Sequence, residues 1–511
     1  MRKRWIGAFL GFVLLGGVFA QNRADTIVIA QGVDVTVLDP NNQLETPTAN
    51  VLSNIFDPLY LRMPDGSAKP WLATGVRAVN PTTWEMTIRP GIKFHNGEDL
   101  TAETVKWNFD RVIDPAKPLR ISNSWAALSK VEVINPTTLR FTFRNPFPLF
   151  QTRLTGFFIL PQKYVLENGN KYLQEPIGTG PYKFVRWVRD QQFELEANPN
   201  YWNGAPKIKR VIFRPIPEAS SRVAELISGG VDIITNLVPE AVNAVRAAST
   251  ADVRTVPSIR NIFIILNTQD KKDSPLANPK VRLALNYAVD KRAIVKNVLG
   301  GYGQPTGCPL NAYIFGYDPR SCQPYEYNPA RAKQLLAEAG YPGGFSMTLG
   351  SPNGRYLNDR QVAEAVVGQL AQVGVKVDLR VQEWSSYVGQ ILERKIPTDA
   401  VLLGWGNNEF DADNSLYSLF YGGTVRGGPR QVAFSYVRSV PLDNALLQAQ
   451  RTIDPEPRKK LYLDALKVLR AEAPWIFLHQ QEDLYGVSKR IDWKPRPDER
   501  LLVADMAIKG P

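Results

Sequence analysis

The chain has 511 residues, of which 44% are hydrophobic and 22% charged, and its 61 Lys+Arg against 49 Asp+Glu give a formal net charge of +12. A chain of this length predicts about three domains or lobes with buried cores. The composition excludes a disordered chain, a collagen-like repeat and a disulfide-rich miniprotein. Two histidines and two cysteines are too few for a His-rich or multi-cysteine metal site. The basic residues are scattered, so no nucleic-acid-binding tail is predicted.

The first twenty residues have the pattern of a cleavable export signal. Basic residues at positions 2–4 precede an apolar stretch at 5–19, and Val18 and Ala20 fit the small residues that precede a cleavage site. The stretch is shorter than the roughly 20 residues that span a bilayer. No cysteine follows it for lipid attachment. We therefore predict a signal peptide at residues 1–20 and a periplasmic mature protein, with a membrane anchor as the alternative.

Short strand patterns dominate the first half of the mature chain, separated by turn residues such as Asn96-Gly97. The segments predicted to contain strands are residues 25–30, 83–94, 131–144 and 176–215. Helical periodicity appears at residues 49–59. A second helix is predicted after Thr101, because threonine suits the N-cap position, and it runs through Val112.

Helices alternate with strands in the second half. Asn278, Asn328 and Asp454 each precede a proline, and such a pair is typical of a helix start. Further helices are predicted from Asp290 to Gly300 and at residues 359–373 and 385–393. The predicted strands are residues 375–381, 400–405 and 475–479. This alternation indicates the α/β class.

The two cysteines, Cys308 and Cys322, lie 14 residues apart in a segment rich in glycine and proline. In an oxidising compartment they are expected to form a disulfide. A closed loop of this size contributes about 3 kcal/mol in the chain-entropy model. Two buried free thiols are the alternative, and the absence of a C-x-x-C pattern argues against a redox role.

The sequence offers little for catalysis. A Ser or Cys nucleophile requires a histidine base, and the chain has only His95, beside an Asn-Gly turn, and His479, in an apolar strand. No G-x-S-x-G, P-loop or H-E-x-x-H motif is present. Acid pairs such as Asp411 and Asp413 occur in glycosidases but are also common by chance. An exported hydrolase is therefore only a remote alternative, and no cofactor is predicted.

The segment 404–414 is the most informative for function. An apolar strand ends at Trp405 and continues into a polar, acidic loop. In α/β sheets, ligands lie beyond the carboxyl ends of strands. A tryptophan face beside hydrogen-bonding groups suits an organic ligand of mixed polarity. A core tryptophan followed by a solvated loop is the alternative.

A series of motifs in a fixed order covers almost all of the mature sequence. They are KPWLATGVRAVNPTTWEMTIRPGIKFHNGEDLTAETVKWNFDRV (69–112), EPIGTGPYKFVRW (175–187), NPNYWNGAPKIKRVIFRPIPEASSRVAELISGGVDI (198–233), NPKVRLALNYAVDKRAIVKNVLGGYG (278–303), NPARAKQLLAEAGYPGG, EWSSY and LLGWG. Together they resemble the oligopeptide/dipeptide/nickel-binding family of solute-binding proteins (family 5), which capture solutes for ABC importers outside the membrane.

The resemblance implies a two-lobed α/β fold of the periplasmic-binding-protein (Venus-flytrap) type, with an extra subdomain inserted in lobe I. The expected boundaries are 25–66, 177–267 and 486–511 for lobe I, 67–176 for the inserted subdomain, and 268–485 for lobe II. Two hinge segments are expected to cross near Asn267 and Tyr485-Gly486. The resemblance also implies that the lobes close around the ligand, because a ligand that contacts both lobes favours the closed state.

The resemblance also implies ligand-binding residues. In peptide-binding relatives the tryptophans of the E-W and G-W motifs line the pocket, and they match Trp384 and Trp405. An aspartate three residues after the second tryptophan pairs with the peptide ammonium, but this chain has Asn408 there. Loss of a buried charge partner costs about 2–5 kcal/mol, roughly a 30- to several-thousand-fold loss of affinity. The candidates to replace that carboxylate are Glu409, Asp411 and Asp413.

Three further residues are candidates by resemblance. Arg355 lies in a loop comparable to one that carries ligand-binding groups, and it could form a bidentate pair with a carboxylate. Thr46 and Thr48 lie in a first-lobe loop near the pocket and could donate hydrogen bonds. Each also has a purely structural alternative, which for Arg355 is a solvated loop arginine.

The predicted function is capture of a peptide or peptide-like solute and its delivery to a membrane-embedded ABC permease. A sugar, an opine or a metal chelate is the alternative ligand in the same transport role. Direct nickel ligation is not indicated, because histidine is so scarce. The protein is expected to be a monomer that binds no nucleic acid.

Overall fold

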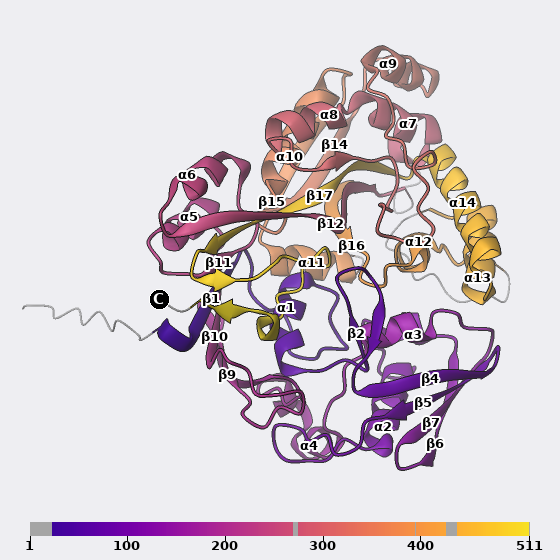
Figure 1. Cartoon of the computed structure of the whole chain (residues 1–511). Coiled ribbons are helices and arrows are strands. Elements are labelled where there is room, and N and C mark those ends of the chain that lie inside the picture. The colour runs from indigo at the N-terminus through magenta and orange to yellow at the C-terminus, as the bar shows by residue number, and fades with distance from the viewer. Residues whose placement is uncertain (1–22, 269–273, 394, 426–436, 510–511) are drawn as a thin grey trace, which may run out of the picture.

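The computed structural model describes residues 23–268, 274–393, 395–425 and 437–509. The predicted signal peptide lies outside these residues. Figure 1 shows a large sheet that runs through the upper and left parts of the molecule, and a separate small sheet at the lower right. No helix in the described ranges combines the length and apolar character that crossing a membrane requires.

The large sheet extends through both lobes. In spatial order its strands are β15 (Lys376–Gln382), β14 (Ser346–Pro352), β16 (Ala400–Gly406), β12 (Ala251–Leu266), β17 (Trp475–Ser488), β11 (Ile233–Ile234), β1 (Thr26–Gln31), β10 (Arg210–Pro215), β9 (Gln192–Ala197) and β8 (Tyr182–Val188), with β13 (Gln304–Pro305) beside β17. The end from β11 to β8 belongs to lobe I, and the end from β15 to β16 belongs to lobe II.

The antiparallel strands β12 and β17 join the two ends of this sheet. At one end β17 pairs with β11 through Val487 and Ile233, and at the other end β12 pairs with β16 from Arg260 to Leu266. Their mutual register shifts between Pro257 and Asn261. The prediction placed a strand only at residues 475–479 and none on β12, because long strands buried on both faces lack the alternation that marks a half-buried strand.

Helices cover the large sheet on both sides. In lobe I they are α1 (Thr46–Ile55), α5 (Ala219–Ile227) and α6 (Val242–Ala247). In lobe II they are α7 (Pro279–Ala288), α8 (Lys291–Ala293), α9 (Pro329–Glu338), α10 (Asp359–Ala371), α11 (Trp384–Leu392), α12 (Ala412–Phe420), α13 (Val440–Arg451) and α14 (Pro455–Glu472). The expected caps are present, since the side chains of Asn278, Asn328 and Asp454 each accept a hydrogen bond from a first-turn backbone N–H.

The inserted subdomain has its own sheet and its own aromatic core. The sheet is ordered β4 (Ala73–Asn80), β5 (Thr83–Ile88), β7 (Thr138–Phe143) and β6 (Leu128–Asn135), and the helices are α2 (Ala102–Ile113), α3 (Phe150–Arg153) and α4 (Gln162–Asn168). A short hairpin of β2 (Tyr60–Arg62) and β3 (Ala68–Pro70) leads into it. Phe109 of α2 stacks on Phe157 with ring centroids 3.8 Å apart. The subdomain therefore has a hydrophobic core separate from those of the lobes.

The chain returns from the insert to lobe I through Gly178 and Gly180, which press against the end of α1. The amide of Gly180 donates to the carbonyl of Ile55 at 2.8 Å, and a Cβ on Gly178 would lie 2.1 Å from that same oxygen. His95 contacts the same turn, with its Nε2 3.0 Å from the Gly180 carbonyl. Burial lowers the pKa of His95 to about 4, so the imidazole is neutral and has a structural position.

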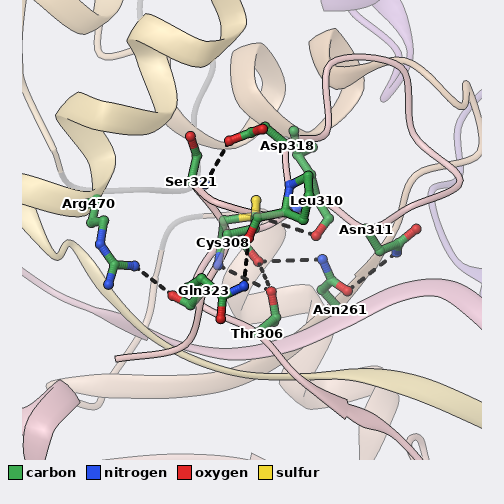
Figure 2. Close-up of a disulfide and its surroundings, with 11 residues drawn as sticks. Asn261, Thr306, Cys308, Leu310, Asn311, Asp318, Ser321, Gln323 and Arg470 are labelled. Atoms are coloured by element: carbon green, nitrogen blue, oxygen red, sulfur yellow. Dashed lines mark hydrogen bonds between the residues drawn. A yellow bond between two sulfur atoms is a disulfide. The ribbon is translucent and has the colours of Figure 1, made fainter. Parts of the chain in front are cut away.

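A disulfide joins Cys308 to Cys322, as expected from their spacing, with an S–S distance of 2.01 Å (Figure 2). Both cysteines are buried. The loop that the disulfide closes is hydrogen-bonded to strand β12. Asn261 Nδ2 donates to the Cys308 carbonyl at 3.5 Å, and Asn311 Nδ2 donates to Asn261 Oδ1 at 3.4 Å.

Candidate functional site

A cavity of about 840 Å³ lies where the two lobes and the inserted subdomain meet. Lobe I contributes the N-terminal end of α1 and the segment from residue 492 to 507. Lobe II contributes the loop between β16 and α12, and the insert contributes residues around Trp125 and Arg153. A volume of this size is within the range of small-molecule sites.

The β16–α12 loop supplies the lobe II wall, as its position after a strand predicted. Trp405, Asn408, Glu409 and Asn414 line the cavity. The indole Nε1 of Trp405 donates to Asn414 Oδ1 at 3.1 Å, which fixes the orientation of the ring. Loop and helix are joined by Asp411, whose side chain caps α12 by accepting from the Asp413 amide.

The two aspartates of this loop do not line the cavity. Asp411 pairs with Arg458 Nη1 at 2.8 Å and accepts from the Tyr462 hydroxyl at 3.0 Å. Asp413 is fully buried and paired with Arg153 of the insert. Burial raises the pKa of Asp411 and raises that of Asp413 to about 7, and the neighbouring arginines only partly offset this. Asp411 therefore does not reach the cavity, because its carboxylate is paired with Arg458 and Tyr462 within lobe II.

Glu409, the third acid of the loop, both lines the cavity and is paired with an arginine. Its Oε2 is 3.3 Å from Arg153 Nε, and its backbone carbonyl accepts from Thr152 Oγ1 at 2.9 Å. Arg153 thus holds two lobe II carboxylates from the inserted subdomain. These buried ion pairs fasten the insert to lobe II.

The lobe I wall begins with Glu45 and Thr46, the residues before and at the start of α1. Glu45 Oε2 accepts from Thr36 Oγ1 at 2.9 Å and from Trp384 Nε1 at 3.3 Å. Burial raises the pKa of Glu45, so its ionised form is incompletely compensated by the protein. Its neighbour Thr48 is fully buried away from the cavity, where its hydroxyl accepts from the Thr36 amide at 3.2 Å.

Trp384 and Arg355 lie one side chain away from the cavity, behind Glu45. Trp384 is 3% exposed, and the Arg355 guanidinium is 5.3 Å from its ring centroid. Arg355 instead lines a small second cavity of about 20 Å³, together with Thr46, Asp483 and Glu499. Its Nε has no hydrogen-bond partner among the described residues. Trp384 is not among the residues that line the 840 Å³ cavity, because its indole N–H donates to Glu45.

Arg260 of β12 connects the walls of the cavity. Its Nε donates to Glu499 Oε1 at 2.6 Å, its Nη2 to Thr46 Oγ1 at 2.7 Å and its Nη1 to the Gly404 carbonyl at 3.0 Å. Thr46 therefore reaches the cavity, as expected, but its hydroxyl already accepts from Arg260. The nitrogens of this guanidinium thus donate to protein acceptors, namely Glu499, Thr46 and the Gly404 carbonyl.

Sequence reasoning missed Glu45, Arg260, Arg153 and Arg500 as cavity residues. Glu45 had a signal, since it lies in the same first-lobe loop as Thr46 and Thr48. The three arginines had none, because they come from β12, the insert and the C-terminal segment, which only the fold brings together. Neither His95 nor His479 lines the cavity. The described residues contain no group of three or more His, Cys, Asp or Glu placed to hold a metal ion.

Comparison with known proteins places this geometry among characterised binding proteins. Residues 67–427 match the model of the bacterial extracellular solute-binding proteins, family 5 (middle region). The chain is 31% identical over 500 residues to the glutathione-binding protein GsiB of Salmonella typhimurium, covering 96% of this chain and 95% of that protein.

Two solved structures have the same fold. The periplasmic binding protein DppA of Helicobacter pylori, in complex with the peptide STSA, superposes with a TM-score of 0.86 at 26% identity, covering 95% of this chain and 98% of that one. The binding protein AgaA of A. tumefacien R10, in complex with agropinic acid, gives 0.85 at 25% identity, covering 95% and 99%. The similarity therefore extends over the lobes and the insert together.

Proposed function

We propose that this chain, which belongs to family 5 of the bacterial extracellular solute-binding proteins, captures a peptide or peptide-like solute in the cavity between its lobes. Proteins of this family bind small solutes outside the cytoplasm for ABC importers and deliver them to a membrane permease; they are transport proteins rather than enzymes. The class of function follows from the family. The solute is the part that needs argument from the site.

The observation that carries the proposal is the two-sided wall of the 840 Å³ cavity. Trp405 on lobe II offers an aromatic face, and Glu45 on lobe I offers a buried carboxylate. A solute that contacts both walls favours closure by the difference between its affinities for the closed and open states. No chemical conversion of the solute is needed for this role.

Glu45 is the best placed group to accept a solute ammonium. Glu45 lines the cavity, and its burial disfavours the ionised form. Among the described residues its carboxylate accepts hydrogen bonds only from neutral donors, the Thr36 hydroxyl and the Trp384 N–H, and the charges of Arg355 and Arg120 offset the burial in part. A cation that enters the cavity would pair with the carboxylate and so stabilise its ionised form. In this scheme Asn408 contributes hydrogen bonds, while Trp384 and Arg355 act through Glu45 by fixing its orientation and by attracting its charge.

The relatives support a peptide-like solute. GsiB is named for glutathione, a modified tripeptide, and the DppA complex contains a tetrapeptide. One observation favours the alternative of a non-peptide solute, since Asn408 stands where peptide-binding relatives have an aspartate. AgaA, which holds agropinic acid, has the same fold. An opine in the same transport role is therefore the second candidate.

The test is native mass spectrometry of the purified mature protein, followed by identification of any solute released on denaturation. If the purified protein carries no solute, the shift in its melting temperature is measured with glutathione, a dipeptide, a tetrapeptide and agropinic acid. A solute at about 100 times its Kd adds about 2.7 kcal/mol of stability. Binding of a peptide or glutathione supports the proposal. Binding of agropinic acid alone would overturn the peptide proposal in favour of an opine.

The remaining parts of the proposal concern export and motion. We propose cleavage after Ala20, a periplasmic location and a monomer, which N-terminal sequencing of the exported protein and light scattering would test. We keep the other lobe boundaries of the sequence prediction but move the end of the second lobe I segment, and with it the first hinge crossing, from residue 267 to 257–261. The register shift of β12 lies there, whereas Asn267 follows the whole segment that pairs with β16.

A further inference from the structure

Five arginines line the cavity, and four of them donate their guanidinium hydrogen bonds to protein acceptors. These four are Arg62, Arg153, Arg260 and Arg496. The acceptors are carboxylates, backbone carbonyls and threonine hydroxyls. A guanidinium has five N–H donors in a planar fork, so a buried one that lacks acceptors carries a high free-energy cost.

Arg500 is the fifth. It lies in the C-terminal segment of lobe I, and within the described ranges its guanidinium has no hydrogen bond to protein. Its Nη1 is shielded from solvent and has no partner. Only its backbone amide is engaged, donating to Asp498 Oδ1 at 3.3 Å. Burial lowers the pKa of Arg500, which is the direction expected for an under-compensated cation.

The carboxylates beside Arg500 in sequence are already paired with other arginines. Asp498 takes both Nε and Nη2 of Arg496, at 2.9 and 2.7 Å. Glu499 takes Arg260 Nε at 2.6 Å. The protein therefore places at the cavity wall a partly buried guanidinium to which no described carboxylate is hydrogen-bonded. The charges of Asp498 and Glu499 offset the effect of burial on its pKa only in part. The anion that fits the fork best is planar and has two oxygens.

We propose that Arg500 is the anchor for a carboxylate of the bound solute, which makes the solute an anion or a zwitterion rather than a neutral or purely cationic molecule. This inference deepens the proposed function and rests on it for the location of the solute. It assigns recognition of the carboxylate to lobe I, the same lobe that presents Glu45. Lobe I then binds both charges of a zwitterion, the ammonium through Glu45 and the carboxylate through Arg500. Trp405 of lobe II covers the solute on closure.

The test measures binding of trialanine and of trialanine amide, which lacks the carboxylate, to the mature protein by calorimetry. In the wild type the acid should bind about 30-fold or more tightly than the amide, as expected for a buried charge pair. Arg500→Gln should reduce this ratio to near unity, and Arg500→Lys should restore only part of it, because lysine lacks the fork. Lys489→Gln, which removes an exposed cation of the same segment, should keep the ratio.

A second probe separates failure of this inference from failure of the proposed function. Propionate and propionamide, at up to about 100 mM, test the fork without a peptide backbone, with the shift in melting temperature as readout. Stabilisation by propionate that Arg500→Gln abolishes, without binding of trialanine, supports the anchor and overturns the peptide. Trialanine binding with an acid-to-amide ratio unchanged by Arg500→Gln overturns the anchor and leaves the peptide. Binding of neither probe overturns both.

The ligand-free protein gives an independent readout. Arg500→Met removes a partly buried cation whose guanidinium has no hydrogen bond to the described protein, so the melting temperature should stay constant or rise. Arg496→Met removes the partner of buried Asp498, so the melting temperature should fall. An equal fall in both variants would show that Arg500 has a structural role, and it would overturn the anchor.

Discussion

The two walls of the cavity differ in how completely their charged residues are paired, although lobe I also holds the pair of Arg496 with Asp498. On lobe II the acidic loop after β16 has three carboxylates, and all three are paired with arginines, Glu409 and Asp413 with Arg153 and Asp411 with Arg458. On lobe I, Glu45 accepts only from neutral donors and the Arg500 guanidinium donates to no protein group that the structure describes.

This difference shows that the density of charged residues in a motif does not indicate binding capacity. The acids of the lobe II loop shape the wall and fasten the insert to it. The isolated charges of lobe I, by contrast, are left to be matched by a solute. Buried charge without a partner is costly to the protein, so such groups are retained where a ligand completes them. Five variants test this contrast.

Arg153→Met should have the largest effect, because it leaves Glu409 and buried Asp413 without a cation. We expect the free energy of unfolding at pH 8 to fall by about 3–5 kcal/mol, measured by urea denaturation. Arg77→Met, which breaks the exposed pair with Glu85, should change it by less than about 1 kcal/mol. A similarly small loss for Arg153→Met would contradict a structural role of the lobe II acids.

Asp413→Asn should change the pH dependence of stability. The folded pKa of Asp413 is about 7 against an ordinary 3.8, so between about pH 4 and 7 the folded state holds a proton that the unfolded state releases. Stability of the wild type should therefore fall as pH rises through this window, by about 4 kcal/mol relative to the variant. Urea denaturation at several pH values measures this, and parallel profiles would refute it.

Glu45→Gln should weaken binding of solutes with a free amine by about 30-fold, because it removes the charge that faces the ammonium. Binding of an N-acetylated probe should change little. Calorimetry with trialanine and N-acetyltrialanine makes the comparison. Equal losses for both probes would mean that Glu45 acts by shaping the wall rather than by its charge.

Trp405→Ala should weaken binding by about tenfold, since an aromatic contact contributes about 0.5–1.5 kcal/mol beyond the area it buries. The fold should be retained, because the indole is only partly buried at the end of β16. Circular dichroism checks the fold and calorimetry the affinity. Unchanged affinity would remove Trp405 from the pocket.

Asn408→Asp should have the smallest effect. It restores the carboxylate that peptide-binding relatives have and should improve the affinity for free-amine peptides by a few-fold, limited by competition with Glu45. A panel of dipeptides to pentapeptides measures the gain. No gain for any of them would indicate a pocket built for another solute.

Much of the architecture could be predicted from the sequence. Helix starts at Asn278, Asn328 and Asp454 are set by local capping, which depends on a few adjacent residues. The family motifs predicted the two-lobed fold. Strands β12 and β17 were missed or shortened, because a run such as residues 259–266, buried on both faces, has no period-two pattern.

The site was less predictable. The loop after β16 was found because the position beyond a strand end is a local signal. Trp384, Thr48 and Asp411 were candidates from the sequence, but packing buries their side chains away from the cavity. Arg153 and Arg500 come from segments with no distinguishing pattern. Whether a charged side chain is already paired depends on contacts between distant segments, and a single sequence does not contain that information in readable form.

The cavity wall is completed by residues near the C-terminal end of the chain. Glu499 holds Arg260 and Arg500 lines the cavity, while Asn54 of α1 donates to the carbonyl of Leu501 at 3.0 Å. Synthesis proceeds from the N-terminus, so an unfinished chain has the motif-bearing loop but not the finished site. Solute affinity is therefore acquired only after synthesis has passed these residues, and a shorter nascent chain does not bind the solute.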